Sequence, residues 1–344
     1  MYHLTREQSI AKMNDYGGLG IPFLFIIDFS GEMPIVLGRH EILDNEICFD
    51  FNGIRNCEPP YLESAPDFLF EGFPIHYAHY KRAFDVVMRN FIWGNSFLLN
   101  LTFPTPVLTD MDFRRIFAFS NAKYRLYIKN QLVVFSPESF VRIDGDLISS
   151  FPMKGTIDAS ISNARQVILD DPKETAEHIT IVDLVRNDIG MIADHVHVRR
   201  FRYIDTLETS EKTLLQVSSE VCGLLHGDFR KHIGTLLFRM LPAGSISGAP
   251  KKKTVEIIRE AEGYNRGYYT GVCGWFDGVN LDSGVMIRYL ERTPDGTILF
   301  KSGGGLTVYS DPVSEYQELI DKVYVPFSRD SQSITPPILE SSLS

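Results

Sequence analysis

The sequence predicts a single large α+β domain. Its apolar, strand-like runs and its helix-like stretches interleave irregularly, without the regular alternation of a doubly wound parallel sheet. Its 344 residues, 44% hydrophobic and 23% charged, are typical of a globular chain with an ample core, and neither a repeat nor a linker divides them. We expect residues 1–70 to form a short N-terminal strand layer of this domain and residues 71–326 its core. Residues 327–344 should form a loose tail, because they are polar and rich in serine.

Apolar spacing predicts the elements of the first half of the chain. Strands are expected within residues 20–36. Apolar side chains recur three or four positions apart over residues 77–93, which is the helical period. A strand is expected at 96–103. Residues 125–129 and 132–135 flank a two-residue polar turn and predict a β-hairpin.

Prolines mark two helix starts in the second half. Pro172 opens a predicted helix over 172–189, and Pro250 opens one that ends near Glu262, because proline is favoured in the first helical turn. The other predicted elements are strands at 269–276, 285–291 and 298–302 and a helix over 312–323.

Charge and cysteine usage exclude several classes of protein. The formal net charge of −10 argues against nucleic-acid and anionic-membrane partners. We see neither a secretory signal nor an apolar run of membrane-spanning length. The four cysteines form no CxxC pair, so reduced thiols in a cytoplasmic protein are the simplest interpretation.

Lys154 is the first candidate for chemistry. It lies between Pro152 and Gly155, two residues that fix local backbone geometry. If the ammonium group were buried there, loss of solvation would lower its pKa and make the lysine a nucleophile. A solvated surface lysine is the alternative, since lysine is rarely buried.

Two pairs of glutamates have the same spacing. Glu174 and Glu177 lie three apart in one predicted helix, and Glu315 and Glu318 do so in another. This spacing puts both carboxylates of a pair on one helix face. Two such faces meeting across a cleft would form an oxygen-rich site suited to Mg²⁺, while solvated helix surface is the alternative.

Three glycine-rich stretches, residues 241–250, 266–271 and 303–305, could bind an anion through backbone N–H groups or could simply be tight turns. None matches a nucleotide-binding loop. Arg288 interrupts an apolar strand, so it either reaches the sheet edge or grips a carboxylate. We interpret the charged residues of segment 181–188 as a helix end tied by internal ion pairs.

Together these segments resemble the chorismate-utilising enzymes, the family that contains anthranilate synthase, aminodeoxychorismate synthase and isochorismate synthases. The resemblance covers about residues 75–325 and implies an anthranilate synthase component I type of domain, with stacked antiparallel sheets flanked by helices around a chorismate-binding catalytic core. The segments that carry it are PMKGT at 152–156, AEHITIVDLVRNDIG at 176–190, LPAGSISGAPKKKTVEIIREAE at 241–262, RGYYTGVCGWFDG at 266–278, MIRYLER at 286–292 and SGGGLTVYSDPVSEYQELIDKV at 302–323.

Lys154 places the resemblance closest to aminodeoxychorismate synthase component I, since anthranilate synthases usually have alanine at this position. The resemblance implies that Lys154 attacks C2 of chorismate as the C4 hydroxyl leaves, and that ammonia then adds at C4 and expels the lysine. The product would be 4-amino-4-deoxychorismate, used for 4-aminobenzoate and folate synthesis. Glu138 matches the glutamate that protonates the departing hydroxyl.

The resemblance also implies a magnesium site and a substrate site. Mg²⁺ would bind the ring carboxylate of chorismate and would be held by Glu174, Glu177, Glu315 and Glu318. The predicted substrate-binding residues are Arg288, Gly304, Gly305, Tyr268, Ser247 and Gly248.

Two positions depart from relatives. Gln216 stands where the family commonly has histidine, and glutamine can hydrogen-bond the hydroxyl but cannot deliver a proton. This shifts the acid role to Glu138 or lowers activity. Leu98 stands where isochorismate and salicylate synthases have a water-activating lysine, so activation of water there is not expected.

Three functions follow as hypotheses. The first is aminodeoxychorismate synthase component I, with ammonia supplied by a separate glutamine amidotransferase subunit or taken as free ammonium, because no cysteine stands in the context of a glutaminase nucleophile. The second is anthranilate synthase component I, against which Lys154 speaks. The third is a catalytically impaired chorismate-binding protein, for which Gln216 is the best argument.

Overall fold

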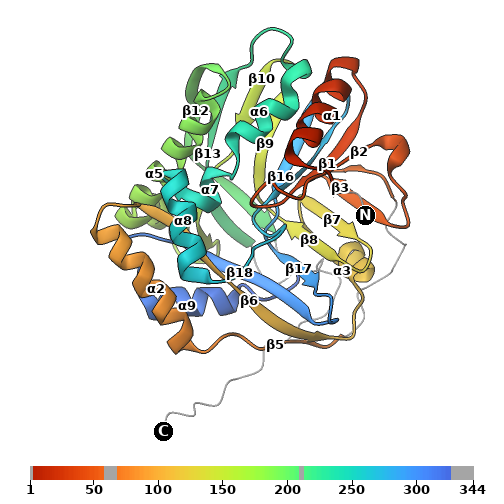
Figure 1. Ribbon diagram of the computed structural model, residues 1–344. Coiled ribbons are helices and arrows are strands. Elements are labelled where there is room, and N and C mark those ends of the chain that lie inside the picture. Colours follow the sequence, from red (N-terminus) through yellow and green to blue (C-terminus); the bar gives the residue numbers. More distant parts are fainter. Residues whose placement is uncertain (1–2, 58–67, 209–212, 327–344) are drawn as a thin grey trace.

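The computed structural model of the protein describes residues 3–57, 68–208 and 213–326, and the predicted tail, residues 327–344, lies outside them. The described chain forms two antiparallel sheets of nine strands each, stacked on one another and flanked by helices (Figure 1). The predicted α+β architecture is therefore confirmed.

The first sheet carries Lys154 on its terminal strand. Its strand order is β11 (Met153–Asp158), β13 (Thr213–Leu224), β10 (Leu147–Ser150), β9 (Ser139–Asp144), β16 (Leu281–Val285), β15 (Val272–Phe276), β1 (Phe23–Ile27) and β2 (Ile35–Gly38), and β12 (Asp194–Glu208) also pairs with β13.

The second sheet carries the triple glycine on β18. Its strand order is β14 (Gly248–Ala249), β6 (Leu98–Thr109), β18 (Ile298–Leu306), β17 (Tyr289–Arg292), β8 (Leu132–Ser136), β7 (Tyr124–Ile128), β3 (Ile47–Phe51) and β4 (Ile54–Arg55), and β5 (Phe70–Gly72) pairs with β6.

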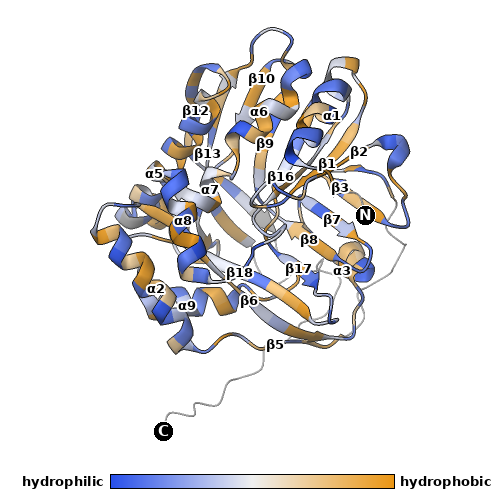
Figure 2. Cartoon of the chain, viewed as in Figure 1, coloured by the Kyte–Doolittle hydropathy of each residue, from blue (hydrophilic) through white to orange (hydrophobic). Residues whose placement is uncertain are grey.

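Strand β1 shows why the sheets stack. All five of its residues are buried, and successive side chains point to opposite faces. Leu24 and Ile26 pack between the two sheets, whereas Phe23, Phe25 and Ile27 pack against the helices outside the first sheet. The hydropathy colouring in Figure 2 shows this strand as apolar along its length, as expected for a strand covered on both faces.

The helices cover the sheets in groups. Helices α1 (Arg6–Leu19), α5 (Pro172–Gly190) and α6 (Ile233–Met240) pack on the outer face of the first sheet. Helices α2 (Tyr77–Ile92), α8 (Lys251–Glu262) and α9 (Pro312–Asp321) pack against β6 and β18, and α3 (Phe113–Phe119) packs near β7 and β8. The short helices are α4 (Ala164–Asp170), α7 (Gly244–Ser247), η1 (Arg39–Glu41) and η2 (Phe229–His232).

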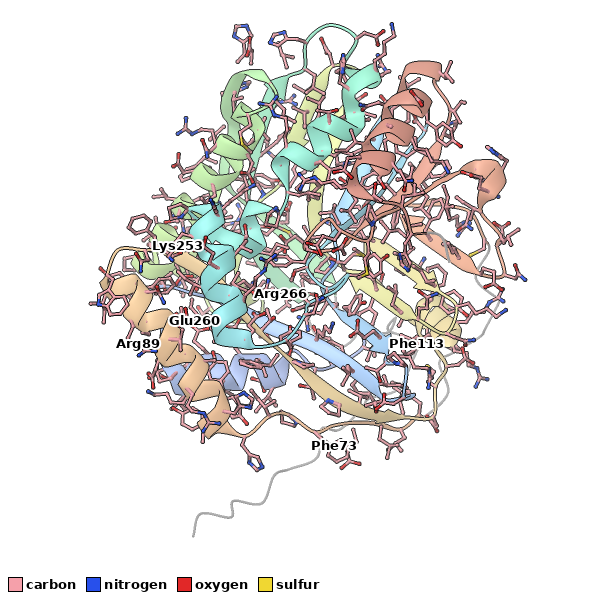
Figure 3. All side chains as sticks on the ribbon, viewed as in Figure 1. Phe73, Arg89, Phe113, Lys253, Glu260 and Arg266 are labelled. Carbon is pink, nitrogen blue, oxygen red and sulfur yellow. The ribbon has the colours of Figure 1, made fainter. Side chains whose placement is uncertain are left out.

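A buried ion pair fixes the end of α8 to the second sheet. Glu262 Oε1 lies 2.6 Å from Arg266 Nη2, and the two side chains are 0% and 1% exposed. The same oxygen accepts a hydrogen bond from the Thr102 N–H at 2.8 Å, and the guanidinium donates to the Asn100 carbonyl at 2.6 Å. In Figure 3 Arg266 lies in the interior, whereas Lys253 and Glu260 project from the exposed side of α8.

Most predicted elements are confirmed, one predicted strand is wrong, and several elements, among them α1, α3, β12 and β13, were not predicted. The single strand predicted at 285–291 is wrong: it is broken between β16 and β17, where Arg288 adopts a left-handed conformation with φ 53°. Helix α1 was not predicted, and it begins at a capping box made by Thr5 and Gln8. The first 70 residues contribute strands to both sheets, and the boundary at residue 70 stays a prediction.

Candidate active site

Lys154 contacts one of the predicted metal ligands directly. Strand β11 packs against helix α5, and Lys154 Nζ lies 2.6 Å from Glu177 Oε2. Gly155, with φ 78°, leaves room for the other glutamate of α5, because a Cβ at this position would lie 2.8 Å from Glu174 Oε2. Lys154 is 27% exposed and paired with Glu177, so it is not a solvated surface residue.

The charge state of Lys154 differs from the prediction. Burial alone would lower the pKa of this lysine, but the carboxylates of Glu177, Glu174 and Glu318 outweigh burial and raise it. The expectation of a lowered pKa is thus wrong for the chain by itself. It considered desolvation and not the neighbouring acids, which the sequence alone does not place.

The second glutamate pair approaches the triple glycine. A Cβ on Gly304 would lie 3.2 Å from Glu315 Oε2 and 3.5 Å from Glu318 Oε1, so the bare backbone of β18 admits both carboxylates of α9. Glu318 also pairs with Lys322 at 2.5 Å. Because Glu318 acts on Lys154 as well, the two pairs converge on one region, hereafter the lysine–glutamate cluster (Lys154, Glu174, Glu177, Glu315 and Glu318).

The cluster suits a magnesium ion in the kind of ligand it offers. Carboxylate oxygens are the donors that Mg²⁺ prefers, and a glycine lies against each glutamate pair: Gly155 against Glu174, and Gly304 against Glu315 and Glu318. In the described residues no three histidine, cysteine or acidic side chains are arranged as a metal site. Two of the carboxylates, Glu177 and Glu318, are instead held by lysines. An ion would therefore have to take the place of these ammonium groups.

Glu138 lies in a small cavity near the cluster. It sits between β8 and β9, and its Oε1 accepts a hydrogen bond of 2.6 Å from the Ser245 hydroxyl. Burial raises the pKa of Glu138, while the Ser245 hydrogen bond and the charge of Lys322 act in the opposite direction. The cavity is also lined by Pro152, two residues before Lys154, and by Asp188. A buried carboxyl with a raised pKa suits the predicted acid role.

Gln216 lies beside the Lys154 strand. It is half-buried on β13 and pairs with Thr156 of β11, two residues beyond Lys154. Gln216 therefore lies on the strand next to the one that carries Lys154.

The predicted Tyr268 and its neighbour Tyr269 have different surroundings. The hydroxyl of Tyr268 donates to the Met33 carbonyl at 2.6 Å and lies 2.9 Å from His3 Nδ1, so it faces the N-terminal segment. Burial raises the pKa of Tyr269, and the charges of Arg288 and Glu138 also act on it. The structure therefore brings Tyr269, not Tyr268, near the predicted site residues.

Ser247 and Gly248 are used in backbone packing. The buried Ser247 hydroxyl donates to the Ala243 carbonyl at 2.8 Å within its own helical turn. Gly248 packs on the backbone of Leu98, where a Cβ would lie 1.8 Å from the carbonyl oxygen. Their neighbour Ser245, which was not predicted, is the residue of this segment that reaches Glu138.

Arg288 and Gly305 are the other predicted substrate-binding residues, and both lie on the side of the second sheet. Arg288 Nη1 donates to the Lys322 carbonyl at 2.7 Å, and its guanidinium lies 4.5 Å from the centre of the Tyr324 ring. The end of α9, rather than a carboxylate, is therefore what anchors this arginine. Gly305 pairs with Asn100 on β6, beside Gly304.

Sequence reasoning missed three further polar residues near the site: Ser245, Tyr269 and Lys322. Each lies inside one of the segments that carried the resemblance. Their chain positions alone do not show which side chain of a segment points inward, and only the folded backbone decides this.

Comparison with known proteins now defines the class. Residues 52–328 match the family described as chorismate binding enzyme. The chain belongs to this family, which confirms the predicted resemblance.

Curated relatives agree at the family level. The chain is 44% identical over 327 residues to an uncharacterized PabA-like protein of Haemophilus influenzae, covering 95% of this chain and 98% of the relative. It is 45% identical over 317 residues to a PabA-like protein of Pasteurella multocida, covering 92% and 98%. Aminodeoxychorismate synthase component 1 of Bacillus subtilis is 33% identical over 211 residues, covering 58% of this chain and 44% of the relative.

Solved structures support the fold. The menaquinone-specific isochorismate synthase from Escherichia coli has a TM-score of 0.70 at 14% identity, covering 93% of this chain and 82% of that chain. Anthranilate synthase component I from Streptococcus pneumoniae has a TM-score of 0.63 at 24% identity, covering 77% and 60%. The predicted type of domain is thereby confirmed. Among the described residues, no helix is long and apolar enough to cross a membrane.

Proposed function

We propose that this chain is aminodeoxychorismate synthase component I, which converts chorismate and ammonia to 4-amino-4-deoxychorismate through a covalent intermediate on Lys154. The observation that carries the proposal is the position of Lys154, 2.6 Å from Glu177 and within the charge field of both glutamate pairs. A lysine that served only the fold would not need a site built by two separate helices and two glycines.

The chemistry follows from the neighbours of Lys154. The amine attacks C2 of chorismate, both ring double bonds shift toward C4, and the C4 hydroxyl leaves as water after Glu138 supplies a proton. Ammonia then adds at C4 and loses a proton, both double bonds shift back, and the lysine departs from C2 as the amine. Since only the free amine is nucleophilic, breaking the ion pair between Lys154 and Glu177 is part of activation.

Chorismate carries carboxylates, so a chain with a net negative charge needs local positive groups to bind it. Glu174, Glu177, Glu315 and Glu318 would hold Mg²⁺, which when bound would neutralise the ring carboxylate of chorismate. Arg288 and the backbone N–H groups of Gly304 and Gly305 would bind carboxylate from the second sheet. Tyr269 would contribute a phenol on the same side.

Ammonia would come from a separate glutamine amidotransferase subunit or from free ammonium. All four cysteines lie in the described residues, and none is exposed: Cys48, Cys222 and Cys273 are buried and Cys57 is half-buried. A glutaminase nucleophile has to meet its substrate, so these thiols are poor candidates for that role.

Product identification tests the proposal. Incubation of the chain with chorismate, Mg²⁺ and ammonium should yield 4-amino-4-deoxychorismate, and addition of a chelator should stop the reaction until Mg²⁺ is restored. Anthranilate as the product would replace the proposal by the second hypothesis, which the likeness to anthranilate synthases keeps open. Chorismate binding without turnover would favour the third hypothesis and would point to Gln216.

A further inference from the structure

A second ion pair lies on the other side of the Glu138 cavity. Asp188, in the last turn of α5, has its Oδ1 2.7 Å from Nζ of Lys251, the first residue of α8. Only 9% of the aspartate side chain and 24% of the lysine side chain are exposed. The proposed chemistry does not use this pair, although burying two charges costs free energy.

Both members of the pair also bind the segment that joins α6 to α8. Asp188 Oδ2 accepts a hydrogen bond from the Gly244 N–H at 3.1 Å, and Lys251 Nζ donates to the Met240 carbonyl at 2.5 Å. A Cβ on Gly244 would lie 2.7 Å from Asp188 Oδ2, so glycine is what permits the contact. The pair therefore holds this segment at two points, at Met240 and at Gly244.

The held segment contains the hydrogen-bond partner of Glu138. Ser245 follows Gly244 directly, and its hydroxyl donates to Glu138 Oε1 at 2.6 Å. Glu138, Asp188, Gly244 and Ser245 line the same cavity. Because the hydroxyl occupies Oε1, the second carboxyl oxygen is the one left to carry the proton that passes to substrate.

We propose that Asp188 and Lys251 are positioning residues which act through Ser245: their ion pair holds α7 so that the serine hydroxyl orients the Glu138 carboxyl. This inference rests on the proposed function, in which Glu138 protonates the leaving hydroxyl. It adds three residues to the reaction, none of which touches the reacting atoms.

A double-mutant cycle on kcat for chorismate consumption tests the proposal. Ser245→Ala should lower kcat by about two- to tenfold, the value of one hydrogen bond to the neutral, protonated carboxyl, and should change KM much less. Asp188→Asn should lower kcat to a similar extent. The double variant should be no slower than Ser245→Ala alone, because Asp188 acts through the serine. Effects that multiply in the double variant would overturn the proposal.

Two further variants serve as a replacement, in case Asp188→Asn does not fold, and as a matched control. If Asp188→Asn does not fold, Lys251→Met takes its place in the same cycle with the same expected result. The matched control is Lys253→Met on the same helix, whose exposed pair with Glu256 at 3.0 Å should leave kcat unchanged. A loss of kcat in the control as large as that in Lys251→Met would overturn the proposal.

The failure of the proposed function is distinguishable from the failure of this inference. Product identity tests the first, whereas the cycle follows loss of chorismate whichever product forms. If the wild-type chain does not consume chorismate, hydrogen exchange decides the second. Residues 244–247 should exchange faster in Asp188→Asn and not in Lys253→Met. Unchanged exchange in both variants would overturn the positioning role.

Discussion

Two carboxylate–cation pairs of this chain have the same separation and opposite surroundings. Glu262 and Arg266 lie 2.6 Å apart, are almost fully buried, and have further hydrogen bonds to the backbone of β6. Glu177 and Lys154 also lie 2.6 Å apart, but 27% of the lysine side chain is exposed, and two other carboxylates, those of Glu174 and Glu318, act on the lysine. The first pair is locked by its partners, whereas the second can exchange its partner for another charge.

Burial and the number of further hydrogen bonds decide whether such an ion pair is structural or can take part in chemistry. A buried pair whose other donors and acceptors are all engaged specifies the packing of a helix on a sheet. Lys154 is half-exposed, and the acids that hold it also suit a metal ion. Its ion pair can therefore break when another cation takes the place of the ammonium group. The first two of the following predictions each change one member of these pairs, and the other two test a neighbouring acid and an exposed pair.

The largest effect is expected for Lys154→Ala. Turnover of chorismate should fall at least about a thousandfold, because the covalent route needs the amine. Steady-state kinetics with ammonium measure this. Lys301→Met is the matched control, since Lys301 is buried, pairs with Glu291 at 2.7 Å and plays no part in the proposed chemistry. It should lower stability and leave kcat nearly unchanged, and equal losses of kcat in both variants would remove the contrast.

Glu262→Gln should act on stability instead. It leaves the buried Arg266 without a counter-charge, so the free energy of unfolding should fall by about 3–5 kcal/mol. Urea denaturation measures the loss. The kcat of the protein that remains folded should be close to wild type, and a loss under about 1 kcal/mol would contradict the assigned structural role.

Glu138→Gln should lower kcat about a hundredfold with a smaller effect on KM, because the amide cannot donate an acidic proton. The wild-type pH profile should show the same group. The raised pKa of Glu138 extends its protonated form to higher pH than for an ordinary glutamate. Activity that depends on this proton is therefore full at lower pH and falls as the pH rises through that pKa. A falling limb that persists in Glu138→Gln would assign the titration to another group.

The smallest effect is expected on the exposed face of α5. Arg186 and Asp183 form an ion pair of 2.6 Å, with 53% and 65% of the side chains exposed. Arg186→Gln should change the free energy of unfolding by less than about 0.5 kcal/mol and should leave kcat unchanged. Thermal denaturation and the standard assay check this. A large change in the free energy of unfolding or in kcat would mean that exposed ion pairs matter as much as buried ones.

The elements that the sequence did predict are those with local signals. The spacing of residues 77–93 and the proline at the start of α5 predict helices without any knowledge of neighbours. The break at Arg288 was missed because a left-handed residue inside an apolar run leaves no mark in periodicity. Helix α1 was missed because it buries few residues and has little apolar periodicity to detect.

The candidate site was predicted less completely, for a physical reason. Which of two adjacent side chains points inward depends on the strand and turn that carry them, so Tyr268 was named, whereas the charges of Arg288 and Glu138 act on Tyr269. The pKa of Lys154 depends on acids from α5 and α9, far apart in the chain. The identities of Lys154, Glu138 and the four glutamates could be read from spacing and resemblance, but their mutual charges could not.

Mass spectrometry of the protein after incubation with chorismate and Mg²⁺, without ammonium, tests the central claim most directly. The protein should gain a mass equal to chorismate less one water, located on the peptide that contains Lys154 and absent from Lys154→Ala. Added ammonium should discharge the adduct as 4-amino-4-deoxychorismate appears. Turnover to this product at an undiminished rate in Lys154→Ala would contradict the claim.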